Sequence, residues 1–121
     1  MSFKGRKFPF RLKCAWQGIL RSWHNEASIR TQMLAGVLAL SSLFIIKPPL
    51  VWCALVVVMI CIVLVLELVN TALEHVLDGL HPENAEFVRM AKDCAAGAVL
   101  LASLFAVAVY AMMLLSLRRD L

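Results

Sequence analysis

An uninterrupted apolar run in the middle of the chain most constrains its fold. Leu50 to Leu66 are seventeen residues in a row without a charge, and helical sequence continues past Glu67 to about Leu80. A transmembrane helix needs about 20 mostly apolar residues, so this run predicts a membrane span. Two further apolar stretches have a similar character. We therefore predict an all-α membrane protein with three transmembrane helices, at about 28–46, 50–80 and 87–117.

The composition agrees with this prediction. Of the 121 residues, 62% are hydrophobic, and the mean hydropathy is +0.84, whereas soluble domains are about 45–50% apolar. Three spans of about 20 residues use half of so short a chain, which leaves room for a single domain over residues 1–121. Residues 1–23 are basic and mixed, without the apolar core or cleavage site of a secretory signal, so we expect none.

An amphipathic segment precedes the first span, from about residue 8 to residue 30. Apolar residues recur there every three or four positions and form one face, while polar and basic residues occupy much of the rest. Trp16 and Trp23 lie on the apolar face, and tryptophan favours the headgroup level of a bilayer. This pattern predicts a helix that lies on the membrane surface.

Basic residues set the expected orientation. Seven of the twelve Lys and Arg residues precede the first span. With the N-terminus inside, Arg89 and Lys92 raise the inner total to nine, against three outside at Lys47, Arg118 and Arg119. The positive-inside rule therefore predicts a cytoplasmic N-terminus. For a basic segment beside membrane spans, we expect the anionic lipid bilayer as the partner, and no nucleic acid.

Small residues follow one face of the third predicted span. They are Ala95, Ala98, Ala102 and Ala106. Small side chains allow two membrane helices to approach closely. Since three helices do not easily enclose a polar site, we expect a homo-oligomer.

Five polar residues share one face of the second predicted span and are called the polar arc below. At about 100° per residue, they fall within an arc of about 100° on the helix. The arc begins just inside the bilayer and runs out through the inner interface. Asn25-Glu26, where the surface helix meets the first span, and Lys92-Asp93, which opens the third span, lie at nearly the same depth. The polar arc consists of Glu67, Asn70, Thr71, Glu74 and Asp78.

Several carboxylates stacked at this depth cost free energy of membrane insertion, and a binding or catalytic function would explain why the sequence keeps them. An ionised side chain near the bilayer centre costs about 3 kcal/mol on insertion scales, and neighbouring carboxylates repel one another. Mg²⁺ would relieve the repulsion, because it binds one or two carboxylates together with nucleotide phosphates. A remaining carboxylate could accept the proton of an attacking hydroxyl. The alternative is a solvated helix face without chemistry, which suits Asp78 best and Glu67 least.

Two strings of residues resemble a known family. The first is ELVNTALEHVLD at 67–78, and the second is AKDCAAGAVL at 91–100. Trp16-Gln17-Gly18 and Trp23 to Ala27 extend the likeness to the surface helix, so that it covers nearly the whole chain. These motifs resemble the bacterial integral-membrane diacylglycerol kinase and undecaprenol kinase family.

The resemblance implies a homotrimer in the bacterial inner membrane, with active sites shared between subunits at the cytoplasmic interface. It implies ATP with Mg²⁺ as the phosphoryl donor and a membrane lipid alcohol as the acceptor. Carried over by position, the resemblance implies that Glu74 is the catalytic base and that Glu26 and Glu74 bind Mg²⁺. It implies that Lys92, Asp93 and Asp78 bind the nucleotide and its phosphates. It implies that Glu67 and Asn70 support the lipid site.

The acceptor lipid is open at this point. Asn25-Glu26-Ala27 is similar to the diacylglycerol branch, whereas residues 93–98 are similar to the undecaprenol branch. Gln32 and Met33 stand where the diacylglycerol branch tends to carry another glutamate. We expect diacylglycerol, converted to phosphatidic acid, with undecaprenol as the alternative.

Two functions of other classes remain as alternatives. One is a small oligomeric membrane transporter, and the other is a non-catalytic assembly subunit. Transporters place ionisable residues near the midplane of their spans. Here the carboxylates gather at one interface, which disfavours the transporter.

Overall fold

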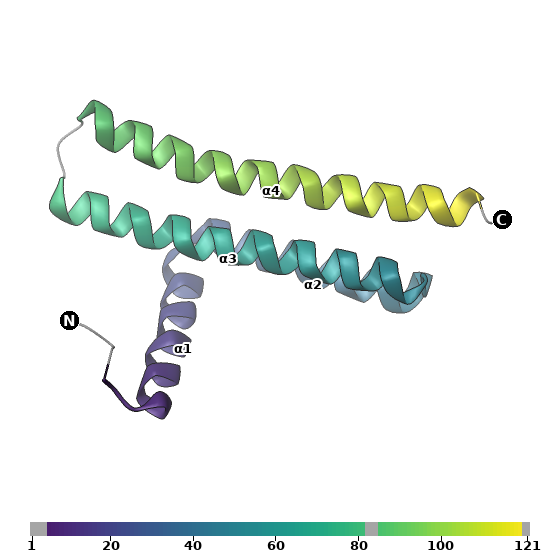
Figure 1. The fold of residues 1–121 in the computed structure, drawn as a ribbon, viewed down its shortest axis with the longest axis horizontal. Helices are drawn as coiled ribbons and strands as arrows, with labels where there is room; N and C mark the ends of the chain where they lie inside the picture. The colour runs from purple at the N-terminus through teal and green to yellow at the C-terminus, as the bar shows by residue number, and fades with distance from the viewer. Residues whose placement is uncertain (1–4, 82–84, 120–121) are drawn as a thin grey trace.

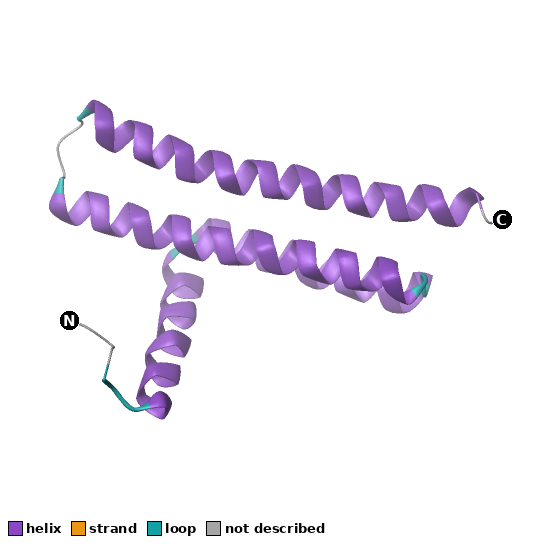
Figure 2. Cartoon of the chain, viewed as in Figure 1, coloured by secondary structure: helices purple, strands orange, loops and turns teal. Residues whose placement is uncertain are grey.

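The computed structural model describes residues 5–81 and 85–119 of the chain. These residues form helices α1 Phe8–Asn25, α2 Ala27–Ile46, α3 Leu50–Leu80 and α4 Glu86–Arg119. Three of them, α2, α3 and α4, are long and apolar enough to cross a membrane. The prediction of an all-α fold with three spans is confirmed for the described residues (Figure 2). Pro82, Glu83 and Asn84, which lie between the second and third predicted spans, are outside the described residues.

The turn between α2 and α3 follows from three consecutive residues. Lys47 takes a left-handed backbone conformation with φ 52°, and its N–H donates to the Leu43 carbonyl at 2.9 Å. This closes the last turn of α2 in the way a C-terminal cap does. Pro48 cannot continue a helix because it has no N–H to donate, and Pro49 then precedes the first residue of α3. The two spans are therefore joined by a tight reversal.

The corner between α1 and α2 is sharper than the sequence pattern predicts. Glu26 is extended (φ −120°, ψ 114°), so α1 ends at Asn25 and α2 begins at Ala27. The Arg30 guanidinium donates to the carbonyls of Trp23 at 2.6 Å and His24 at 3.1 Å. It thus satisfies carbonyls that the end of α1 leaves free. The predicted end of the surface helix near residue 30 is wrong, because residues 27–30 belong to α2.

The spans pack around α3. Helix α3 contacts both α2 and α4, whereas no Cα atom of α2 comes within 8 Å of one in α4 among the described residues. Helix α1 runs crosswise to the three spans and contacts α2 and α3 (Figure 1). A small core of Leu43, Val56 and Met113 ties the spans together. Most other large apolar side chains point outward, as expected of a surface that faces lipid or other subunits.

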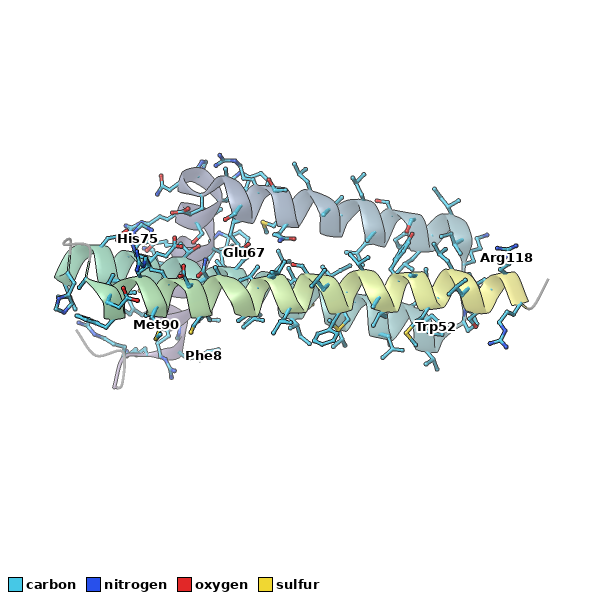
Figure 3. The ribbon with its side chains drawn as sticks, turned by 90° about the horizontal axis from the view of Figure 1, so that it is seen from above. Phe8, Trp52, Glu67, His75, Met90 and Arg118 are labelled. Carbon is cyan, nitrogen blue, oxygen red and sulfur yellow. The ribbon has the colours of Figure 1, made fainter. Side chains whose placement is uncertain are left out.

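The labelled side chains of Figure 3 show which end of the bundle carries which chemistry. Glu67 and His75 lie near the level at which α1 meets the spans, while Trp52 and Arg118 lie at the opposite end (Figure 3). The polar arc therefore belongs to the α1 end of the bundle, far from the turn between α2 and α3.

Candidate active site

The membrane-side part of the polar arc is buried. Glu67 is 5% exposed and Thr71 is 6% exposed, and they are the buried polar residues among those described. The Ser28 hydroxyl on α2 donates to Glu67 Oε2 at 3.3 Å. Within the described ranges, no Lys, Arg or His comes within ion-pair distance of Glu67. Its carboxyl group is therefore removed from water with a neutral hydroxyl as its one described polar partner.

Asn70 and Glu74 follow Glu67 along the same face. The Asn70 Oδ1 atom is buried and accepts no hydrogen bond in the described structure. Leaving a buried oxygen without a hydrogen bond lowers folding stability by about 1–3 kcal/mol. A hydrogen-bond donor or a cation that binds to Asn70 Oδ1 would recover that cost. Glu74, one turn further on, is half-buried, and its carboxylate likewise bonds to no described side chain. The centre of the polar arc thus presents an amide oxygen and a carboxylate that accept no hydrogen bond from any described side chain.

Glu26 reaches α3 from the corner between α1 and α2. Its Oε1 atom lies 3.5 Å from Nε2 of His75, which adjoins Glu74 in the sequence. The His75 side chain is 67% exposed and the Glu26 side chain 30% exposed, so the contact lies at the edge of the bundle. The corner residue is therefore held beside the polar arc, at the depth that the sequence predicts.

Lys92 is attached to the outer end of the polar arc. Its Nζ atom lies 2.5 Å from Oδ1 of Asp78, which joins α4 to α3. The Lys92 side chain is 35% exposed and that of Asp78 is 63% exposed, so the pair faces water. Asp93 follows at the same depth and is exposed, without a hydrogen bond or ion pair to any described residue. The structure thus brings Lys92, but not Asp93, into contact with the arc.

A cleft lies between α1 and α3 beside these groups. Its volume is about 470 Å³, and Gly18 and Ser22 of α1 face Thr71 and His75 of α3 across it. Arg21 and Asn25 also line the cleft, so part of its wall is polar. A cleft of this size at the membrane edge has room for a headgroup or a phosphate next to the Glu26–His75 contact.

The residues of the site fit Mg²⁺ by their chemistry. Glu26, Asn70 and Glu74 offer oxygen atoms, the ligands that Mg²⁺ prefers. Among the described residues, no three His, Cys, Asp or Glu side chains converge on one point. Mg²⁺ usually takes one or two carboxylates and completes its shell with water and substrate phosphates. The buried, unpartnered Asn70 Oδ1 and the unpaired Glu74 are consistent with that kind of binding.

Three contacts of the site were not predicted from the sequence. They are those of Ser28 with Glu67, of His75 with Glu26, and of Arg30 with the end of α1. Ser28 and His75 lie at the same depth as the groups that they contact, and this depth can be counted from the sequence. The rotation of each helix about its own axis cannot be derived from the sequence, because the sequence does not say in which direction the chain turns at Glu26.

Comparison with known proteins places these elements in one family. Residues 13–114 match the family described as prokaryotic diacylglycerol kinase. A protein of Synechocystis sp. named diacylglycerol kinase is 36% identical over 84% of this chain, and the match spans 58% of that protein's length. Proteins of the same name from Escherichia coli strain K12 and Shigella flexneri are 30% identical, over 84% of this chain and 84% of their own length. The matched region contains every residue of the candidate site, and the chain belongs to the prokaryotic diacylglycerol kinase family.

Proposed function

We propose that this protein is a membrane lipid kinase that transfers the γ-phosphoryl group of ATP to the free hydroxyl of diacylglycerol, which yields phosphatidic acid. The observation that carries the proposal is the family match over residues 13–114, which contains the polar arc and the two contacts flanking it. The named relatives are all diacylglycerol kinases, which favours diacylglycerol over undecaprenol. A transporter or an assembly subunit would not account for that match.

Nucleotide phosphates bind at the water-facing end of the arc. Asp78 holds the Lys92 Nζ atom at 2.5 Å beside the arc. The flexible lysine side chain can exchange this partner for a phosphate oxygen, which its positive charge attracts. Asp93 stands next to it on the same turn of α4. Glu26 and Glu74 would hold Mg²⁺, and the unpartnered Asn70 Oδ1 could serve as a further oxygen ligand. When bound, the cation neutralises charge on the phosphates during transfer.

The bond changes require one proton acceptor. The oxygen of the lipid hydroxyl forms a bond to the γ-phosphorus, the bond from that phosphorus to the bridging oxygen of ADP breaks, and the hydroxyl proton passes to a carboxylate. Glu74 is the first candidate for this base because it lies at the centre of the arc, half-buried and unpaired. There a hydroxyl at headgroup level meets a nucleotide that enters from water.

Glu67 is the second candidate, and a specific observation favours it. A carboxylate that binds a cation has part of its charge and lone pairs engaged, so Glu74 is less suited to act as both ligand and base. Glu67 is 5% exposed and lies about 10 Å deeper than Glu74, with Ser28 as its neutral partner. It is thus the carboxyl group nearest to the lipid phase. Separate glutamine variants of the two residues distinguish the assignments.

The protein works as a homotrimer in the bacterial inner membrane, with its N-terminus in the cytoplasm. Nine basic residues against three support this orientation. The outward apolar side chains of the spans provide surface for contacts between subunits, which supports a homo-oligomer.

A direct assay tests the proposal. Purified protein in mixed micelles is given labelled ATP with either diacylglycerol or undecaprenol. Label should appear in phosphatidic acid, and excess EDTA should abolish it. Hydrolysis of ATP that does not depend on any lipid would exclude a kinase, and undisturbed transfer in EDTA would exclude the metal.

A further inference from the structure

Three basic residues gather at the end of the bundle that lies opposite the polar arc. They are Lys47, in the turn between α2 and α3, and Arg118 and Arg119, in the last turn of α4. Arg118 lies at the same end as Trp52 and far from Glu67 (Figure 3). Under the proposed orientation this end faces away from the cytoplasm, where membrane proteins carry few basic residues. The phosphoryl transfer proposed at the polar arc assigns these cations no role.

No acidic side chain among the described residues balances this charge. The side chains of Lys47, Arg118 and Arg119 are exposed and form no hydrogen bond or ion pair with any described residue. The sequence contains no Asp or Glu from position 31 to 66 or from position 94 to 119. Asp120, which follows Arg119, lies outside the described residues. The described part of this end thus carries three positive charges and no negative one.

Arg119 also lines a pocket between the first turn of α3 and the last turns of α4. The pocket has a volume of about 480 Å³, and we call it the far pocket. Trp52 packs against the small core of the spans, which fixes one side of its indole ring. Arg118 adjoins Arg119 in the sequence but is not part of the lining. The far pocket is lined by Trp52, Met112, Leu115, Ser116 and Arg119.

The polar groups of the far pocket can all donate hydrogen bonds. The Arg119 guanidinium and the Trp52 indole N–H can only donate, and the Ser116 hydroxyl donates as readily as it accepts. Within the described ranges, none of these three side chains is hydrogen-bonded. A phosphate carries negative charge and several acceptor oxygens, so it satisfies a set of donors of this kind. The far pocket is therefore complementary to a phosphate.

The remaining walls favour a phosphate that belongs to a lipid. Met112 and Leu115 are exposed apolar side chains, and a soluble phosphate would leave them uncovered. Tryptophan and arginine at the end of a span lie at the headgroup level of a bilayer. A phospholipid there places its phosphate beside Arg119 and its first methylene groups along Met112 and Leu115. An anionic headgroup fits better than a zwitterionic one, because a zwitterion brings a cation of its own to an end that is already basic.

We infer that the far pocket binds the phosphate of an anionic phospholipid, in the leaflet that faces away from the polar arc. Arg119 holds the phosphate, and Ser116 and Trp52 add hydrogen bonds to it. Arg118 and Lys47 contribute only to the positive potential around the pocket. The bound lipid is not a substrate of the proposed reaction, since the far pocket and the candidate active site lie at opposite ends of the bundle.

Tryptophan fluorescence identifies the lipid beside Trp52. Replacing Trp16 and Trp23 by phenylalanine leaves Trp52 as the one tryptophan of the chain. The protein is reconstituted in vesicles with the same lipids in both leaflets, and phosphatidylglycerol or phosphatidylcholine is brominated near the top of its acyl chains, where bromine quenches a neighbouring tryptophan. We expect about a fivefold preference for phosphatidylglycerol, which corresponds to the contribution of about 1 kcal/mol from one basic side chain at a membrane surface. Equal quenching by the two lipids would refute the inference.

Two arginine variants separate a site from a diffuse attraction. Arg119→Gln should abolish the preference for phosphatidylglycerol, whereas Arg118→Gln, the matched control, should retain most of it. Both substitutions remove one charge at one level of the bundle, so an equal loss in both would exclude a site. A preference that survives in Arg119→Gln would exclude it as well. Glycerol phosphate at millimolar concentration should leave the quenching unchanged; relief of quenching would indicate a pocket for a soluble phosphate and overturn the inference.

Native mass spectrometry repeats the comparison on the chain with all its tryptophans, so the result does not depend on the two phenylalanine substitutions. From micelles that contain equal amounts of the two lipids, the protein should retain phosphatidylglycerol, and Arg119→Gln should retain less of it than Arg118→Gln does. Equal retention by the two variants contradicts the inference. If Arg119→Gln alone changes the oligomer size, Arg119 contacts a neighbouring subunit and the inference is wrong.

Discussion

Replacing Glu74 by glutamine separates a catalytic carboxylate from a solvated one. The substitution keeps the size and one acceptor oxygen of the side chain, but glutamine cannot accept a proton or offer a full charge to Mg²⁺. Glu74 is half-buried and bonds to no described side chain, so the change breaks no internal contact. The expected loss of stability is therefore within about 0.5 kcal/mol, as for an ordinary surface position.

The expected loss of activity is far larger. Removal of a general base lowers the rate by about 10²–10⁴-fold, which corresponds to roughly 3–5 kcal/mol of transition-state stabilisation at 1.36 kcal/mol per decade. Loss of a metal ligand would add to this. The two interpretations of Glu74 thus differ by several kcal/mol in the barrier but by little in folding, so one variant decides between them.

The assay is kcat with diacylglycerol, measured beside circular dichroism and oligomer size in detergent. Glu86→Gln is the matched control, since Glu86 is an exposed glutamate near the same end of the bundle, paired with Arg89 at 2.6 Å and outside the polar arc. A folded Glu74→Gln protein that keeps more than about a tenth of wild-type activity would refute the assignment. The base would then be sought at Glu67 or Asp93. If added Mg²⁺ restores the lost rate, Glu74 is a ligand and Glu67→Gln becomes the decisive variant.

The remaining predictions concern the neighbours of Glu74. Glu26→Gln should raise the KM for MgATP more than it lowers kcat, and unaltered metal and nucleotide dependence would remove Glu26 from the site. Ser28→Ala should lower the free energy of unfolding in detergent by about 1–3 kcal/mol, because it leaves the buried Glu67 carboxyl group without its hydroxyl donor. Asp78→Asn should raise the KM for MgATP less than Lys92→Met does, by up to about fivefold, since an exposed pair contributes about 0.2–1 kcal/mol; an effect as large as that of Lys92→Met would contradict this ranking.

The spans could be predicted because each has a local signal. The apolar run of α3 and the Pro48-Pro49 pair after α2 determine where the helices lie, and the observed bounds agree with the predicted ones to within two residues. The depth of the site was predictable for the same reason, since rise per residue places Glu26, Asp78 and Lys92 at one level. The contacts of Glu26 and Lys92 with α3 are consistent with that placement.

The sequence places the junction of the surface helix and the first span at Asn25-Glu26, but the sharp change of direction at Glu26 could not be predicted. No glycine or proline marks it, and the end of α1 is stabilised by Arg30, which lies in the next helix. The rotation of α2 relative to α3 depends on that corner, so the contact between Ser28 and Glu67 was not accessible from periodicity.

The length of α3 explains how one helix serves two phases. Its 31 residues extend for about 46 Å, whereas the hydrocarbon core is about 30 Å thick. If α3 begins at the outer surface, Glu67 lies about 25 Å along it, still within the apolar layer, and Asp78 lies about 16 Å further, in water. The observed burial follows this order, since Glu67 is 5% exposed and the Asp78 side chain is 63% exposed. In the proposed reaction, a lipid hydroxyl would approach the buried end of the polar arc from the membrane, while a nucleotide would approach the exposed end from water. Neither substrate has to leave its own phase, and the half-buried Glu74 stands between them.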